Sequence, residues 1–356
     1  MNKISGIGKW LCSENASSGE TKRKARMIRE GLGMTSAEYR KTLSKLRKYL
    51  DVVERKMSAK EWDQINYESV PSKANLIYNS AFLRNDQERR LDYLESLKKG
   101  TTKINAGVLQ PHEIVTKYKR DLWRTIRQYD ETLEQLWKNL PDETITNTLC
   151  VRDGSGSMTA SISGKTTCLD AATALTVFMA ERNTGEWKNK FLTFSFNPRV
   201  IDISHCKTLR DKLACIYGYD ECANTDIYKT MMLILKTAVN NHVSQEDMPG
   251  LVVILSDMQF DGRCFNLNKT LFEDIIDEFE AAGYKMPKLC FWNINDRGQC
   301  SVPLQQNDFG LILCSGFSAQ IMKMFMSNKL DPLAVLLEQV NSPRYDVVEE
   351  LIKAVI

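Results

Sequence analysis

The sequence predicts an α/β protein in which an all-helical region precedes a Rossmann-like, doubly wound and mainly parallel sheet. Two observations lead to this fold class. Strand-helix alternation beyond residue 144 is typical of a parallel sheet, and runs that are apolar at every position suit strands covered on both faces. The five apolar runs lie at 144–151, 190–196, 250–256, 288–294 and 309–315, and the helix-like stretches lie at 166–182, 226–242, 267–282 and 318–328. We therefore expect a helical, basic domain at 1–143 and an α/β domain at 144–356, which ends in two helices around Ser342.

The first 143 residues carry several helix signals. Thr35-Ser-Ala-Glu38 and Ser58-Ala-Lys-Glu61 have the spacing of capping boxes, in which the hydroxyl and the carboxylate each bond a backbone N–H of the other residue. Ser72 and Asp86 can each cap the turn that follows. An apolar stripe at helical spacing predicts a last helix near 122–136. Helices of this kind must bury their stripes on one another.

Composition argues against a disordered or fibrous protein. The chain has 356 residues and a formal net charge of +3, with a mean hydropathy of −0.34, as in ordinary globular proteins. No apolar run approaches the roughly 18 residues of a membrane span, and the first residues lack a signal-peptide core. We expect a cytoplasmic protein without a membrane partner. Its cysteines show no Cys-x-x-Cys spacing, so their pattern predicts neither a zinc site nor a disulfide framework.

Basic residues are concentrated in the first 50 positions, where 12 Lys and Arg face 4 Asp and Glu. Such a patch can bind RNA or another polyanion through its phosphates. The alternative is that these side chains are the solvated faces of ordinary helices, and the sequence favours neither. The candidate RNA-binding residues are Lys22, Arg23, Lys24, Arg26, Arg29, Arg40, Lys41 and Lys45.

A possible cation site follows the first predicted strand. Asp153, Ser155 and Ser157 alternate on a glycine-rich turn, where their side chains can converge on one point. Thr225 at a helix start and Asp257 at the end of a later strand can reach the same edge of the sheet. Five hard oxygen donors suit Mg2+ or Mn2+. Taken alone, Asp-Gly-Ser-Gly-Ser is also a common composition of surface turns.

This pattern of Asp-x-Ser-x-Ser, a later Thr and a still later Asp resembles the metal-ion-dependent adhesion site (MIDAS) of von Willebrand factor A domains. The sequence of the whole chain, including Val-Ile-Leu-Ser-Asp-Met258, resembles that of an uncharacterised group in which a helical region precedes such a domain. That group is similar to the Ro ribonucleoprotein class, in which a helical-repeat (TROVE) ring binds small RNA. About 143 helical residues are too few for a closed ring of repeats, so we do not expect such a ring in this chain.

The resemblance implies specific roles for the five residues. Asp153, Ser155 and Ser157 would bind the cation, Thr225 and Asp257 would reach it directly or through water, and a protein partner's Asp or Glu would take the remaining position. It implies binding, not turnover. RNA, small and structured or single-stranded, enters as a second possible partner.

Catalytic motifs are weak by comparison. A serine nucleophile needs a neighbouring base, and none of the three histidines belongs to a recognisable triad pattern. Ser163-Gly-Lys-Thr166 lacks the first glycine and the strand-loop-helix context of a P-loop, and Thr166 or Thr167 is better placed to cap a helix. We therefore expect a non-enzymatic, metal-dependent binding or scaffolding module, with an RNA-binding ribonucleoprotein component as the alternative.

Overall fold

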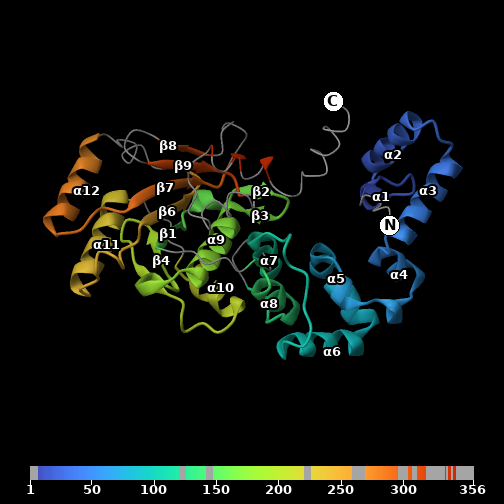
Figure 1. Cartoon of the computed structure of the whole chain (residues 1–356), viewed down its shortest axis with the longest axis horizontal. Helices are drawn as coiled ribbons and strands as arrows, with labels where there is room; N and C mark the ends of the chain where they lie inside the picture. Colours follow the sequence, from blue (N-terminus) through green and yellow to red (C-terminus); the bar gives the residue numbers. More distant parts are fainter. Residues whose placement is uncertain are drawn as a thin grey trace. The chain divides into compact units, whose positions relative to one another are not determined.

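The chain divides into two compact units, Met1–Asn105 and Ala106–Ile356, shown in Figure 1. The computed structural model describes residues 7–119, 126–141, 147–219, 226–258, 269–295, 304–306 and 311–317, and a few positions between 333 and 341. The first unit is helical and the second is an α/β unit, so the predicted order of a helical region before a mainly parallel sheet is confirmed.

Short helices build the first unit, and they bury small apolar clusters rather than one long stripe. Ala25, Tyr39 and Leu43 form one such cluster. In another, the buried guanidinium of Arg90 lies 5.0 Å from the ring centre of Tyr67, an attractive cation–π contact. The helices of this unit are α1 (Ile7–Trp10), α2 (Gly19–Gly31), α3 (Ser36–Tyr49), α4 (Val53–Ala59), α5 (Ser72–Asn85) and α6 (Gln87–Lys98).

The helix caps of this unit follow the sequence in one case and depart from it in others. Thr35 and Glu38 form the expected capping box at the start of α3. The box expected at Ser58 is wrong, because Ser58 lies inside α4 and donates to the Glu54 carbonyl 2.8 Å away. Ser72 is the first residue of α5, not its cap, and Asp86 precedes α6 without a side-chain cap bond. The Asp86 carboxylate instead accepts from Tyr67 Oη at 2.8 Å.

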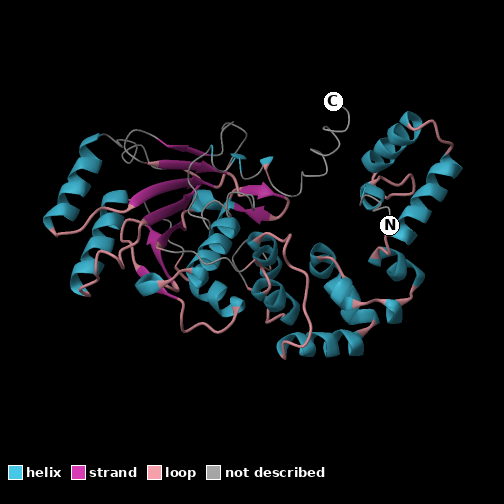
Figure 2. Ribbon diagram, in the orientation of Figure 1, coloured by secondary structure: helices cyan, strands magenta, loops and turns pink. Residues whose placement is uncertain are grey.

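The second unit is built on a seven-stranded sheet with the order β5-β4-β1-β6-β7-β9-β8, drawn in magenta in Figure 2. Pairing is parallel except for the two edge strands, β5 and β8. The five apolar runs of the sequence form the five parallel strands, whereas both short antiparallel edges escaped prediction. The strands are β1 (Thr148–Asp153), β4 (Lys190–Phe194), β5 (Val200–Asp202), β6 (Leu251–Ser256), β7 (Lys288–Asn293), β8 (Leu304–Gln306) and β9 (Ile312–Ser315).

Helices cover both faces of this sheet, as a doubly wound fold requires. On one face, α11 (Ile227–Asn240) and α12 (Lys269–Ala281) pack their apolar side chains against alternate residues of β1, β4, β6 and β7. On the other face, α9 (Cys168–Arg182) contacts β1, and Thr173 of α9 accepts from Arg152 Nε at 2.9 Å. Burial on both sides explains why these strands are apolar at nearly every position.

Two helices that precede the sheet belong to the α/β unit. The helices α7 (Pro111–Tyr118) and α8 (Glu131–Lys138) pack on each other, and α7 packs on α9. The expected boundary at residue 143 marks the change from helix to strand, whereas the compact unit begins at Ala106 because α7 lies against α9. The helix expected at 122–136 begins only at Glu131, since Ile126 forms an isolated bridge with Lys119.

Among the described residues, no helix is both long and apolar enough to cross a membrane. The helix expected at 318–328 and most of the two expected C-terminal helices lie outside the described residues.

Candidate metal centre at the sheet edge

The topology of the sheet brings two carboxylates to one point. Asp153 ends β1, and Asp257 directly follows β6; these strands are parallel neighbours. The chain runs from β1 to β4 on one side and then crosses to β6 on the other. The order in which strands are added to the sheet therefore reverses between β1 and β6. Ligands of open α/β sheets bind at such switch points, outside the carboxyl ends of the strands.

Four of the five candidate ligands are joined here by a chain of hydrogen bonds. The Ser155 backbone N–H donates to Asp153 Oδ1 at 2.9 Å, and the hydroxyls of Ser155 and Ser157 lie 3.0 Å apart. Ser157 Oγ then donates to Asp257 Oδ1 at 3.2 Å. Residues some 100 positions apart in the sequence are thus in direct contact. The fifth candidate, Thr225, lies outside the described residues.

The turn that presents the two serines is anchored in the core. A short 3-10 helix spans Gly156–Thr159, and its Met158 is fully buried. Thr159 Oγ1 donates to the Gly156 carbonyl at 2.7 Å, which tightens the same turn. The turn that follows β1 is therefore held in one conformation by the protein itself.

Ser256 supports the cluster, although sequence reasoning did not single it out. Its hydroxyl is fully buried and donates to Asp153 Oδ2 at 2.7 Å. Ser256 Oγ in turn accepts from the Met258 N–H at 3.1 Å. At Met258 the chain turns with a positive φ of 58°. One hydroxyl thus links the last residue of β1 to the turn after β6. The sequence feature that could have identified Ser256 is its position directly before Asp257, at the end of a predicted strand.

The cluster contains two buried acids, Asp153 and Asp257. Burial raises the pKa of Asp153, and the nearby Asp257 raises it further, while the hydrogen bonds from Ser256 and Ser155 lower it. Asp153 and Asp257 are only 2% and 5% exposed. A divalent cation would relieve both the loss of hydration and the repulsion.

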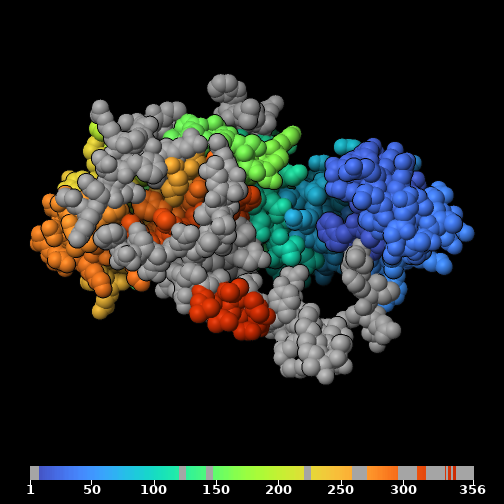
Figure 3. All heavy atoms as spheres, turned by 90° about the horizontal axis from the view of Figure 1, so that it is seen from above, coloured from blue at the N-terminus to red at the C-terminus, as the bar shows by residue number. Residues whose placement is uncertain are grey.

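The Gly-Lys-Thr segment after the Gly156–Thr159 turn serves a structural purpose. Thr167 caps α9 and forms a capping box with Asp170, as expected for one of the two threonines. The hairpin of β2 (Ser161–Ser163) and β3 (Thr166–Thr167) precedes the helix and belongs to the green surface in Figure 3. Buried Asp170 also accepts from Lys119 Nζ at 3.0 Å, so the α9 N-terminus is occupied by protein groups.

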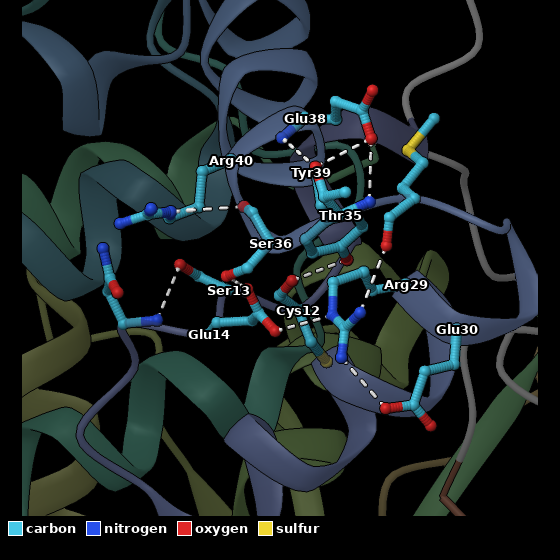
Figure 4. A network of polar contacts seen from close by, with 12 residues as sticks. Cys12, Ser13, Glu14, Arg29, Glu30, Thr35, Ser36, Glu38, Tyr39 and Arg40 are labelled. Carbon is cyan, nitrogen blue, oxygen red and sulfur yellow. Dashed lines mark hydrogen bonds and ion pairs between the residues drawn. The ribbon is translucent and has the colours of Figure 1, made fainter.

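The basic patch divides into two kinds of residue. Arg29 is bound on three sides, because it donates to Glu14 at 3.0 Å, to Glu30 at 2.9 Å and to the Met34 carbonyl at 3.1 Å. Figure 4 shows Glu14 between Arg29 and Ser36. The guanidinium of Arg29 therefore joins α2 to the segments beside it. The remaining members are exposed or partly exposed, namely Lys22, Arg23, Lys24, Arg26, Arg40, Lys41 and Lys45. Two of them also have partners on their own helices, since Lys24 pairs with Glu20 at 2.7 Å and Arg40 donates to the Ser36 carbonyl at 3.2 Å.

Comparisons with known proteins place the two regions in different families. Residues 147–344 match the family model described as "Domain of unknown function (DUF7788)". Residues 4–147 match the model described as "Domain of unknown function (DUF2828)". The change between the two models coincides with the start of β1.

A curated relative and a solved structure are each similar to the chain. The "Uncharacterized protein L728" of Acanthamoeba polyphaga mimivirus is 32% identical in an alignment of 330 residues that covers 87% of this chain. The chain spans 55% of the length of that relative. The crystal structure of the Deinococcus radiodurans RO (RSR) protein superposes with a TM-score of 0.47 at 14% identity, covering 90% of this chain and 72% of that chain.

Proposed function

This chain belongs to the family described as "Domain of unknown function (DUF7788)", and we propose that its α/β unit is a non-enzymatic, metal-dependent binding module. The observation that carries the proposal is the convergence of Asp153, Ser155, Ser157 and Asp257 at the switch point between β1 and β6. The module would hold Mg2+ or Mn2+ and use it to bind an acidic group of a protein partner.

The donor set supports a hard cation. Two carboxylates and two hydroxyls are all oxygen donors, and Mg2+ and Mn2+ prefer such donors. Two carboxylates neutralise the charge of one divalent cation. A partner's carboxylate can therefore bind the cation only where a coordination position is open. Mg2+ takes six oxygens, so these four side chains leave two positions, one for Thr225, the fifth candidate of the sequence, and one for an oxygen of a partner. This donor pattern agrees with the resemblance to von Willebrand factor A domains.

The surroundings of the serines favour binding over hydrolysis. The Ser155 hydroxyl is hydrogen-bonded to the Ser157 hydroxyl, and Ser157 is bonded to a carboxylate. His112 stacks edge-on against Phe317 with a centroid distance of 5.2 Å, which gives that imidazole a packing role. We assign the serines to cation binding.

The test is a calorimetric titration of Mg2+ and Mn2+ into the metal-stripped full chain and its Asp153→Asn variant. Wild type should bind one Mg2+ per chain, and the variant, which keeps the side-chain shape but loses the charge, should bind at least about 100-fold more weakly. The matched control is Asp202→Asn, because Asp202 is an exposed carboxylate at the end of β5. Equal Mg2+ affinity in wild type and Asp153→Asn would contradict the proposal.

The acidic partner is tested separately on the same proteins. An immobilised library of peptides with a single Asp or Glu should retain wild type with Mg2+ and release it on addition of a chelator. Peptides in which Asn or Gln replaces the acid should not retain it. Retention that persists without metal, or in the Asp153→Asn variant, would remove the cation from the binding step.

A second candidate function concerns the helical unit. We propose that the exposed basic side chains of α2 and α3 bind RNA phosphates, without Arg29, whose guanidinium is bound to Glu14 and Glu30. Binding of a single-stranded RNA should weaken with salt at a log-log slope of roughly −0.7 per phosphate contact.

Charge reversal provides the test of the RNA proposal. Reversal to Glu at Lys22, Arg23, Lys24 and Arg26 should abolish retention, whereas reversal of exposed Lys60 and Lys103 in the same unit should change affinity by less than about threefold. Equal loss in both variants would indicate a general charge effect and would discard the patch.

A further inference from the structure

A second cluster of metal-ligating side chains lies away from the oxygen-lined sheet edge. Among the described residues, one group of three or more His, Cys, Asp or Glu side chains has ligand atoms that all lie within 4.8 Å of one another, and it consists of His205, Cys206 and Cys215. His205 and Cys206 lie in the turn between β5 and α10 (Leu209–Tyr217), and Cys215 lies on α10 itself.

We propose that His205, Cys206 and Cys215 form a Zn2+ site with one imidazole and two thiolate ligands. Imidazole and thiolate are the donors that Zn2+ prefers, and it takes four of them in a tetrahedron. Three protein ligands leave the fourth position to water or to an exogenous ligand. This proposal does not depend on the Mg2+ site, because the two clusters share no residue.

The distances fit a small cation after minor adjustment. A Zn–S bond of about 2.3 Å places two sulfurs of a tetrahedron roughly 3.8 Å apart. The three ligand atoms already lie within 4.8 Å of one another, so closing the site needs movements of about 1 Å or less. His205 is exposed and can supply part of this movement by rotation of its side chain, while Cys206 is buried.

The backbone that carries the cysteines is held in place by buried contacts. Glu134 of α8, which is 2% exposed, accepts from the Leu209 N–H at 2.9 Å and from the Arg210 N–H at 3.1 Å. The Cys206 N–H donates to the Ile203 carbonyl at 3.1 Å. The first turn of α10 and the turn before it are thereby fixed to the core. A rigid support of this kind reduces the entropy lost when a cation binds.

Exposure of the cluster suits reversible cation binding. His205 lies at the surface and Cys215 is partly exposed, whereas Cys206 is buried beneath them. A cation can therefore enter from solvent past the imidazole. Cys206 and Cys215 are both free thiols.

This site could not be predicted from the sequence, because the spacing of its cysteines is unusual for a zinc site. Zinc ligands commonly occur as two cysteines separated by two to four residues, whereas eight residues separate Cys206 from Cys215. The turn that starts α10 brings them together, and such a turn is not readable from the spacing alone.

The test is a titration of Co2+, as a spectroscopic substitute for Zn2+, into the reduced and metal-stripped full chain. Wild type should develop the ultraviolet thiolate-to-cobalt band and the strong visible absorption of a tetrahedral site, with one equivalent bound, and Zn2+ should remove both. Cys206→Ser and Cys215→Ser should each lower Zn2+ affinity by more than the roughly 100-fold that loss of a supporting residue can cost. His205→Ala should lower it by at least about tenfold.

The matched control is Cys12→Ser, because Cys12 is also a free and partly exposed cysteine but lies in the other unit. This variant should keep the full cobalt spectrum. Thermal melting of each variant without metal separates a lost ligand from a lost fold. On addition of Zn2+, wild type and Cys12→Ser should gain melting temperature, and the variants at the three ligands should not. Three results would overturn the proposal, namely no thiolate band in reduced wild type, a band that survives both cysteine substitutions, or a Cys206–Cys215 disulfide that forms in air as fast with excess Zn2+ as without it.

Discussion

The sheet edge and the turn before α10 gather metal-ligating side chains by opposite routes. At the sheet edge, residues about 100 positions apart meet because β1 and β6 are parallel neighbours. At the turn, three ligands come from a stretch of eleven residues, 205–215. The first cluster is made only of oxygen donors, and the second of one nitrogen and two sulfurs. Topology thus positions a hard-donor cluster, and a local turn positions a softer one.

This difference predicts opposite metal preferences. Carboxylate and hydroxyl oxygens suit Mg2+, which holds thiolates weakly, whereas Zn2+ prefers thiolate and imidazole. Both clusters lie in the α/β unit, so one protein would carry two cations without exchange between them.

The two proposed sites should lose their cations independently of each other. Asp153→Asn should lower Mg2+ affinity at least about 100-fold and leave the cobalt-thiolate band within about 10% of wild type. The combined Cys206→Ser and Cys215→Ser variant should do the reverse. Parallel calorimetric and optical titrations of both proteins measure all four quantities.

Loss of both metals in either variant would contradict the comparison. That outcome would show that one cluster supports the other, or that the substitution unfolds the α/β unit. Circular dichroism without metal distinguishes these two explanations.

Glu134 holds the backbone at the start of α10, next to the cluster of His205, Cys206 and Cys215. Glu134 is buried and accepts from Leu209, Arg210 and Tyr118. Glu134→Gln removes the charge and one acceptor oxygen, so a buried donor loses its partner. We expect the free energy of unfolding to fall by about 2–3 kcal/mol, and Zn2+ affinity to fall about tenfold with no change in Mg2+ affinity.

Urea unfolding and the cobalt titration measure these two quantities. The control is Glu131→Gln, since Glu131 lies in the first turn of the same helix but is only partly buried. A stability loss without any change in Zn2+ affinity would show that the turn does not need its anchor.

The sequence was sufficient for the parallel strands and for four residues of the oxygen cluster, for a physical reason. Strands buried on both faces are apolar throughout, so 148–153 and 251–256 are recognisable, and polar residues directly after them must lie at the sheet edge. Contact among Asp153, Ser155, Ser157 and Asp257 follows from this placement. Whether these residues hold a cation stays a prediction.

Other features depend on contacts that no short pattern encodes. The helix α10 is nine residues long with a moderate apolar face, and its anchor, Glu134, is distant in the sequence. Arg29 counts as a surface charge in the sequence, but the fold places Glu14 beside it. The unit boundary at residue 106 depends on packing of α7 against α9, which the change from helix to strand at residue 144 does not indicate.

The smallest expected effect concerns Ser256, which supports the oxygen cluster without belonging to the proposed ligand set. Ser256→Ala removes the hydrogen bond to Asp153 Oδ2 and leaves that carboxylate oxygen less well oriented. Loss of such supporting bonds typically costs 10–100-fold in metal affinity, and because Ser155 still fixes the other oxygen, we expect about a tenfold loss for Mg2+. Zn2+ affinity should not change.

The control for Ser256 is Thr176→Val, which removes a buried hydroxyl from α9 without touching the cluster. Calorimetry at equal ionic strength compares the two variants. If both lowered Mg2+ affinity equally, the effect of Ser256 would come from general loosening of the α/β unit. A loss confined to Ser256→Ala would show that the bond between the two strand ends orients Asp153. The sheet edge would then resemble the turn before α10 in one respect, since a buried hydrogen bond outside the ligand set would position the ligands in both.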